Sequence, residues 1–186
     1  MSDLHPYRSH TCGELRKDLA GQTVRLSGWI HRVRDLGGIV FIDLRDHYGI
    51  TQIVLDPEKG FNVDVNHWKL ESVVTFTGVV VARIEGAVNK NLASGEIEVH
   101  ADEIEVQSWT EHMPFNVALE QEMPENIRLT HRYVDLRQQR IHHNIMTRSQ
   151  IISSLRRRMT EKGFNEFQTP ILTASSPEGA RDYLVA

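Results

Sequence analysis

The sequence predicts a closed β-barrel of five strands, followed by a linker and by the first helix and strand of an α+β domain. Two observations carry this prediction. Five stretches between residues 23 and 102 are rich in β-branched residues, and several alternate apolar with polar positions, as half-buried strands do. A long amphipathic stretch from 138 to 162 follows them with the period of a helix. A chain of 186 residues has room for a small domain and part of a second one.

The first elements are expected near the N-terminus. Thr11 to Glu14 fit a helix capping box, so we expect a short helix that continues to about Asp18. A strand over 23–34 then alternates apolar positions, and Asp35 to Gly38 form a turn in which two glycines can take positive φ. The second strand, over 39–46, has Val40, Ile42 and Leu44 on one side and Phe41, Asp43 and Arg45 on the other.

The later strands complete the barrel. A third strand is expected over 50–56, a helix over 61–68, a fourth strand over 73–83 and a fifth over 96–102. Five strands with a helix between the third and the fourth is the order of an OB-fold. Gly28 and Gly78 lie inside strands, where a small barrel needs sharp bends. We therefore expect an OB-fold over 1–106.

A second unit follows the barrel. Residues 107–125 contain Pro114 and Pro124 and show no period, so we expect a linker there. The start of a second domain is expected over 126–186, where the long helix ends before Gly163 and a strand covers 164–172.

Charge and composition limit the function. Residues 1–125 hold 11 basic and 20 acidic residues, whereas residues 126–162 hold nine basic and two acidic ones. A net-acidic domain can still bind RNA if its cations gather on one face. The single cysteine, Cys12, excludes a disulfide within the chain, and the sequence has neither a membrane span nor a signal peptide, so we expect a cytoplasmic protein. The ten histidines show no metal spacing.

The outward face of the barrel carries the candidate chemistry. Arg34, Phe41 and Gln52 lie on the first three strands, and Glu98 lies on the fifth. An aromatic face stacks bases, a cation holds phosphates, and amides or carboxylates recognise base edges. From the pattern alone an alternative is equally open: Phe41 belongs to the core and the polar side chains are merely solvated.

Longer blocks of the sequence resemble bacterial aspartyl-tRNA synthetases. They are Gly28 to Gln52, Asn89 to Val99, Arg132 to Arg137 and Phe167 to Tyr183, and the resemblance extends from about Tyr7 to the end of the chain. It implies that 1–106 is an anticodon-binding OB-fold and that 126–186 begins a class II catalytic domain. The alternatives are an OB-fold RNA-binding protein without enzymatic activity, or a piece of an asparaginyl- or lysyl-tRNA ligase.

The resemblance assigns roles on the barrel. Phe41 would stack on an anticodon base, Gln52 and Glu98 would recognise base edges, Arg34 would hold the anticodon loop, and Asn89 would lie close to it. Two further positions concern tRNA discrimination. Leu36 is typical of enzymes strict for the aspartate tRNA, while a small residue at Gly86 is typical of enzymes that also charge the asparagine tRNA, so strictness is left open.

The resemblance also assigns roles in the C-terminal block. The long helix and Pro170 belong to the first class II motif, which forms the homodimer contact. Glu178 lies in a mobile loop and would bind the ammonium group of aspartate. ATP and Mg²⁺, with tRNA(Asp) and aspartate, are the implied cofactors and substrates of the parent enzyme. Its second and third motifs lie beyond this chain, so we expect no catalytic residue in it, no cofactor bound to it and no aspartate activation by it alone.

Overall fold

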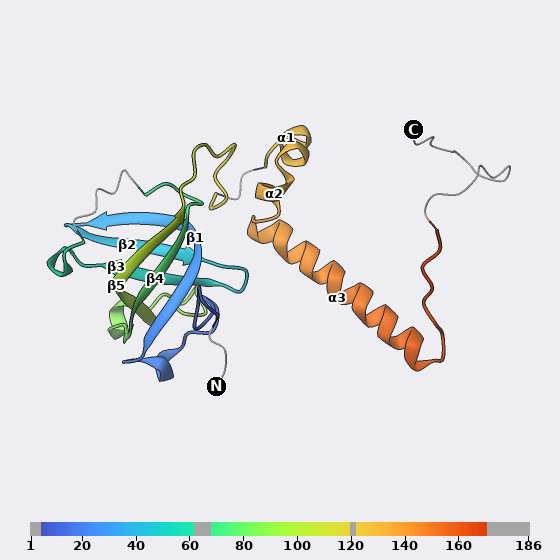
Figure 1. Ribbon diagram of the computed structural model, residues 1–186, viewed down its shortest axis with the longest axis horizontal. Helices are drawn as coiled ribbons and strands as arrows, with labels where there is room; N and C mark the ends of the chain where they lie inside the picture. Colours follow the sequence, from blue (N-terminus) through green and yellow to red (C-terminus); the bar gives the residue numbers. More distant parts are fainter. Residues whose placement is uncertain (1–4, 62–67, 120–121, 171–186) are drawn as a thin grey trace. The chain divides into compact units, whose positions relative to one another are not determined.

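The structure is a computed structural model that describes residues 5–61, 68–119 and 122–170 (Figure 1). The chain divides into two compact units, Met1–Gln138 and Gln139–Ala186. Among the described residues, no helix combines the length and the apolar character that crossing a bilayer requires.

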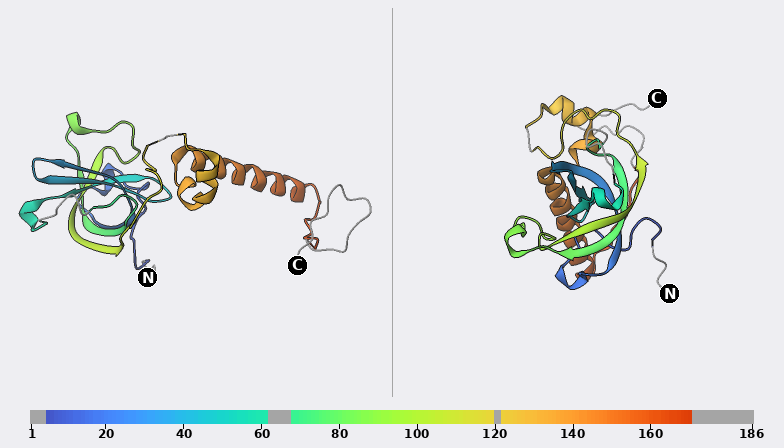
Figure 2. Two further views of the ribbon diagram at one scale, coloured as in Figure 1. Left: turned by 90° about the horizontal axis from the view of Figure 1, so that it is seen from above. Right: turned by 90° about the vertical axis from the view of Figure 1, so that its left-hand side faces the viewer.

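Five strands form a closed barrel in the first unit (Figures 1 and 2). They are β1 (Thr23–Leu36), β2 (Ile39–Arg45), β3 (Ile50–Leu55), β4 (Val73–Ala82) and β5 (Ile97–Ser108). Their order around the barrel is β1-β2-β3-β5-β4, and only the pairing of β3 with β5 is parallel. The predicted OB-fold is confirmed. β5 extends six residues beyond the predicted end at 102, whereas most of the helix expected over 61–68 lies outside the described residues.

The alternation of apolar residues fills the barrel. The inward positions of all five strands are fully or almost fully buried, namely Val24, Leu26, Ile30, Val40, Ile42, Leu44, Ile53, Leu55, Val74, Phe76, Val80, Ile97, Val99 and Ala101. Gly28 and Gly78 allow close backbone approach, because a Cβ atom would collide with the carbonyl oxygen of Arg45 at the first and of His100 at the second. Both glycines are therefore required by the curvature of the barrel.

The helix expected from Thr11 to Asp18 is wrong. A turn is present there instead, followed by the 3₁₀ helix η1 (Lys17–Leu19). Half of the capping box forms, since the Thr11 N–H donates to Glu14 Oε2 at 2.7 Å and this bond lowers the pKa of Glu14. The Cys12 carbonyl, which a helix would use internally, accepts from the Thr51 hydroxyl at 2.7 Å. Barrel contacts therefore override the local helix signal.

The segment after β5 has a small core of its own. Phe115 and Val117 are buried against Val134, which lies in α2 (Arg132–Asp135), just after α1 (Glu125–Thr130). Asp135 is fully buried and accepts hydrogen bonds from the guanidinium groups of Arg128 and Arg132. The stretch expected as a linker is thus partly packed, and the boundary at 125 stays a prediction.

A cluster of charged and aromatic residues ties the end of this segment to the barrel. Arg137 lies over the Trp29 ring at 4.6 Å from guanidinium carbon to centroid, and Arg45 lies 5.6 Å from the same ring. Both arginines donate to Glu71 Oε2, at 2.9 and 2.8 Å. Glu71 has a positive φ of 65°, and its side chain is 3% exposed. We call Trp29, Arg45, Glu71 and Arg137 the arginine clamp.

The second unit contains the predicted long helix. α3 (Gln139–Glu161) ends as expected, with Gly163 in the left-handed conformation at φ 85°. The Gly163 N–H donates to the Thr160 carbonyl and the Phe164 N–H donates to the Met159 carbonyl, which is the Schellman pattern. Residues 164–170 are not a strand, contrary to expectation, because no described strand pairs with them to satisfy their backbone groups.

Candidate nucleic-acid interface

The strand register brings four polar residues together on the outside of the barrel. Asp43 on β2 lies opposite Gln52 on β3, and Arg34 on β1 lies opposite Phe41, two residues before Asp43 on the same face. Glu98 stands on β5, the parallel neighbour of β3. The alternation that buries Val40, Ile42 and Leu44 turns Phe41 and Asp43 outward.

Hydrogen bonds join these four residues into a continuous row. Arg34 Nη2 donates to Asp43 Oδ1 at 2.7 Å and to Gln52 Oε1 at 3.1 Å. Gln52 Nε2 donates to Glu98 Oε2 at 3.2 Å. We call Arg34, Asp43, Gln52 and Glu98 the polar row. The structure thus brings three of the predicted site residues into one network, which alternation alone could not show.

Phe41 supplies the aromatic face beside the polar row. Its ring is half-buried, and its neighbours across the sheet are Arg34 and Val54. A partly exposed ring next to amide and carboxylate groups can stack a base and leave the base edge against the polar groups. The outward position contradicts the alternative in which Phe41 belongs to the core, since the core side chains of β2 are the three residues that alternate with it.

Two residues missed by the sequence analysis extend this network. Arg83, directly after β4, lies with Nε 3.5 Å from Glu98 Oε2 and donates from Nε to the Ile97 carbonyl at 2.9 Å. His100 Nε2 lies 2.9 Å from Glu98 Oε1. His100 could have been found from the sequence, because it follows Glu98 by two residues and therefore lies on the same face of the strand. Arg83 could not, because it follows the end of its strand and no periodicity marks it.

Arg83 is the most deeply placed cation of the interface. Its side chain is 5% exposed, and its Nη2 atom is buried without a hydrogen-bond partner among the described residues. Burial lowers the pKa of the Arg83 guanidinium, while the carboxylates of Glu98 and Asp43 act in the opposite direction.

Three further residues predicted for tRNA binding or discrimination make no hydrogen bond or ion pair with the polar row in the described part of the chain. They are Leu36, Gly86 and Asn89. Leu36 is 66% exposed at the end of β1. Gly86 lies in the 3₁₀ helix η4 (Glu85–Ala87), where an added Cβ would meet open space. The Asn89 side chain folds onto its own loop, accepting at Oδ1 from the Asn91 N–H at 3.0 Å.

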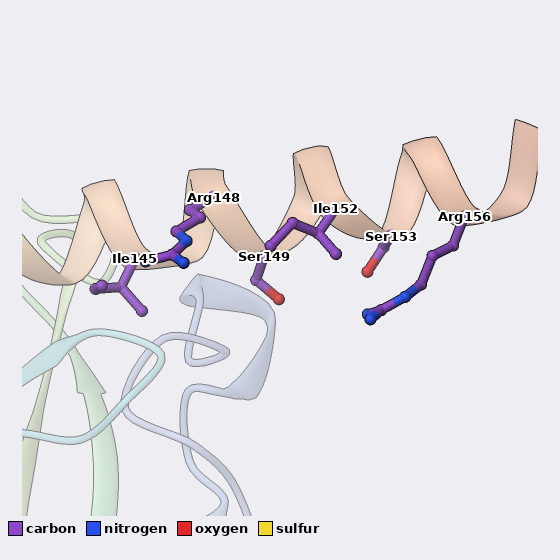
Figure 3. Close-up of a pocket in the computed structure, with 6 residues that line it drawn as sticks. All are labelled: Ile145, Arg148, Ser149, Ile152, Ser153 and Arg156. Atoms are coloured by element: carbon purple, nitrogen blue, oxygen red, sulfur yellow. The ribbon is translucent and has the colours of Figure 1, made fainter. Parts of the chain in front are cut away.

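The structure shows less about the candidate residues of the C-terminal block. Pro170 is exposed in the irregular segment after α3, and Glu178 lies outside the described residues. Figure 3 shows an open pocket on α3, lined by Ile145, Arg148, Ser149, Ile152, Ser153 and Arg156. All six side chains come from one helix, so the pocket is a surface hollow and lacks the converging polar groups of a small-molecule site.

Comparison with known proteins decides the family. A family model described as an OB-fold nucleic acid binding domain matches residues 24–107, and one described as class II tRNA synthetases (D, K and N) matches residues 124–186. An aspartate–tRNA(Asp/Asn) ligase from Zymomonas mobilis is 59% identical over 98% of the chain, and enzymes of the same name from Erythrobacter litoralis and Gluconobacter oxydans are 58% and 57% identical. The chain belongs to the aspartyl-tRNA synthetase family. It spans about 30% of the length of these relatives.

Solved structures of this class agree. Asparaginyl-tRNA synthetase from Pyrococcus horikoshii, complexed with asparaginyl-adenylate, matches 92% of the chain and 38% of its own length, with a TM-score of 0.76 and 26% identity. Aspartyl-tRNA synthetase from Entamoeba histolytica matches 90% of the chain and 40% of its own length, with a TM-score of 0.73 and 22% identity, which bears on the fold alone. These matches confirm the fold, and the family models and the relatives confirm the family predicted from the sequence blocks.

Proposed function

We propose that this chain is the anticodon-binding part of an aspartate–tRNA ligase. The observation that carries the proposal is the polar row beside Phe41 on the outer face of an OB-fold. It offers a stacking surface, hydrogen-bond donors and acceptors for base edges, and the guanidinium of Arg34, whose side chain is 42% exposed. Identities of 57–59% to enzymes named aspartate–tRNA(Asp/Asn) ligase favour aspartate over lysine or asparagine as the amino acid.

Recognition would proceed by exchange of hydrogen bonds. An anticodon base stacks on Phe41, and its edge replaces the bonds that Gln52 makes to Arg34 and Glu98, at 3.1 and 3.2 Å. A matching edge restores every bond, whereas a mismatched edge leaves a largely buried amide unpaired, at a cost of about 1–3 kcal/mol. Arg34 keeps its shorter bond to Asp43, at 2.7 Å, throughout.

We further propose that the parent enzyme accepts both the aspartate and the asparagine tRNA. The relatives whose names include both tRNAs support this choice. The open space around Gly86 supports it too, because a loop without a side chain there leaves room for a different third anticodon base. Gly86 would set this tolerance, Leu36 would act against it as in strict enzymes, and Asn89 would hold the neighbouring loop.

The parent enzyme would activate aspartate with ATP and Mg²⁺ and transfer it to tRNA in the cytoplasm. In this chain Glu178 would pair with the ammonium group of aspartate. α3 and Pro170 would form the contact of a homodimer, which the exposed apolar side chains of Ile145, Leu155 and Met159 support. No residue of this chain is assigned to the ATP phosphates, so adenylate formation by the chain alone is not expected.

Binding to anticodon stem-loops tests the proposal. We expect the chain to bind aspartate and asparagine stem-loops with similar Kd values and a lysine stem-loop at least tenfold more weakly, all at one stated salt concentration. Phe41→Ala should weaken binding by about 1–3 kcal/mol, the value of one stacked base, and Phe41→Tyr should keep it. Equal affinity for the three stem-loops, or no loss in Phe41→Ala, would refute the proposal.

A further inference from the structure

Glu98 has hydrogen-bond partners on both carboxylate oxygens. Oε1 lies 2.9 Å from His100 Nε2, while Oε2 accepts from Gln52 Nε2 at 3.2 Å and lies 3.5 Å from Arg83 Nε. The Glu98 side chain is 20% exposed, so it is held largely within the protein. The shortest of these contacts is the one to His100, on the oxygen that does not face Gln52.

In the contact between Glu98 and His100, the donor and the acceptor are defined. A carboxylate can only accept, so the bond requires a proton on Nε2 of His100. The imidazole is thus a donor toward Glu98 and fixes one of its oxygens. The other oxygen, Oε2, carries the two longer contacts and is the one at which an incoming base edge can exchange.

The imidazole is not needed to hold the strand. His100 is paired through its backbone with Val54 on one side and Val79 on the other, and the core positions next to it are Val99 and Ala101. Its side chain is 34% exposed on the outer face. Replacing the ring therefore leaves the barrel ladder and the core intact.

We propose that His100 is a positioning residue that fixes Glu98 Oε1 and so sets how strictly the polar row discriminates between anticodon bases. This inference depends on the proposed function of the polar row. Without the His100 donor, the Glu98 carboxylate rotates between its partners, and its Oε2 atom no longer has one direction toward Gln52. A matched base still stacks on Phe41, so affinity changes little while discrimination falls.

The test compares His100→Leu with His100→Gln in the 186-residue chain. The first removes the donor and keeps a similar volume, and the second restores an N–H donor. The measured quantity is the Kd for stem-loops with the first or second anticodon base changed, divided by the Kd for the aspartate anticodon stem-loop, since a change of the third base is the one proposed to be tolerated. We expect His100→Leu to reduce this ratio about tenfold, the effect of one charge-assisted hydrogen bond, and His100→Gln to recover most of it.

A double-mutant cycle with Glu98→Gln provides the second measurement. If His100 acts through Glu98, adding His100→Leu to Glu98→Gln produces no further loss of discrimination. Additive losses would overturn the inference, as would an unchanged ratio in His100→Leu or an equal loss in His100→Gln. A native chain that fails to discriminate between the stem-loops would refute the proposed function itself, which is a separate outcome. Thermal unfolding of each variant shows that the barrel is intact.

Discussion

At the scale of single residues, the interface depends on side chains that satisfy one another before any ligand binds. Arg34, Asp43, Gln52 and Glu98 bond among themselves at 2.7–3.2 Å. Such pre-organisation lowers the cost of ordering these groups when a ligand binds. It also gives discrimination, because each group that loses its internal partner must gain one from the ligand.

His31 gives a pH dependence of stability. Its Nδ1 lies 3.0 Å from Arg45 Nη1, which can only donate, so the imidazole accepts there and is neutral. Burial first, and then the charge of Arg45, lower the pKa of His31, with Glu71 and Asp43 opposing. The unfolded chain therefore binds a proton more readily than the folded one, and the free energy of unfolding falls as the pH drops below about 6.5.

The variant His31→Gln isolates this effect. It keeps an acceptor for Arg45 and removes the titrating group, so the loss of stability between pH 7.5 and pH 5.5 should be smaller than in the native chain. Urea unfolding at the two pH values measures the difference. Other histidines contribute equally to both proteins, so an identical pH dependence would show that His31 is not responsible.

Several of these residues could be predicted from the sequence and several could not. Phe41, Gln52 and Glu98 follow from alternation along single strands and from family blocks. Arg83 acts through Glu98 on another strand, and strand register is not encoded in a one-strand pattern. His100 shares a strand face with Glu98, but alternation alone does not show that the two side chains are hydrogen-bonded. Glu178 lies outside the described residues, so its role stays a prediction.

At the scale of elements, the strands were predicted better than the short helices. Strong alternation and the glycines at 28 and 78 fix the barrel, because each bend needs a residue without Cβ. The capping signal at Thr11 failed because Cys12 and Leu15 are both drawn into the barrel core. The capping signal at Gly163 succeeded because the end of α3 needs only local hydrogen bonds.

The arginine clamp attaches Arg137, two residues after α2, to the barrel through Glu71, whose backbone is strained. Positive φ at a non-glycine residue costs about 1 kcal/mol, and Glu71 adopts it to place a buried carboxylate between two guanidinium groups. The clamp therefore combines backbone strain with charge compensation, and the two contributions can be separated by substitution.

Glu71→Ala and Glu71→Gly form a matched pair for this purpose. Both remove the carboxylate and leave Arg45, whose side chain is 11% exposed, without its partner of opposite charge, so we expect a loss of about 3 kcal/mol in the free energy of unfolding for alanine. Glycine adopts positive φ without strain, so its loss should be about 1 kcal/mol smaller. Equal losses in chemical denaturation would contradict the strain argument.

At the scale of the whole molecule, acidic and basic residues are distributed unevenly along the chain. The barrel is net acidic but gathers Arg34 and Arg83 at the polar row, whereas residues 126–162 hold nine basic residues and two acidic ones. The chain thus offers two sources of RNA affinity, the specific face of the barrel and the general electrostatic attraction of a basic helix.

A shortened chain of residues 1–138 distinguishes these sources. This segment is one compact unit with the barrel, the small core around Val134 and the arginine clamp. We expect it to bind the aspartate stem-loop within about threefold of the 186-residue chain, with the same discrimination. A loss of more than tenfold, together with a smaller salt dependence, would place most of the affinity on α3.

The central claim is that the outer face of the barrel binds the anticodon, and nuclear magnetic resonance tests it most directly. Backbone and side-chain amide signals of the chain are followed while the aspartate anticodon stem-loop is added. We predict the largest shifts at Phe41, at the Gln52 side-chain amide and at Glu98, with smaller ones at the ends of β1 and β4. Shifts confined to α3 or to strand faces away from the polar row would contradict the account.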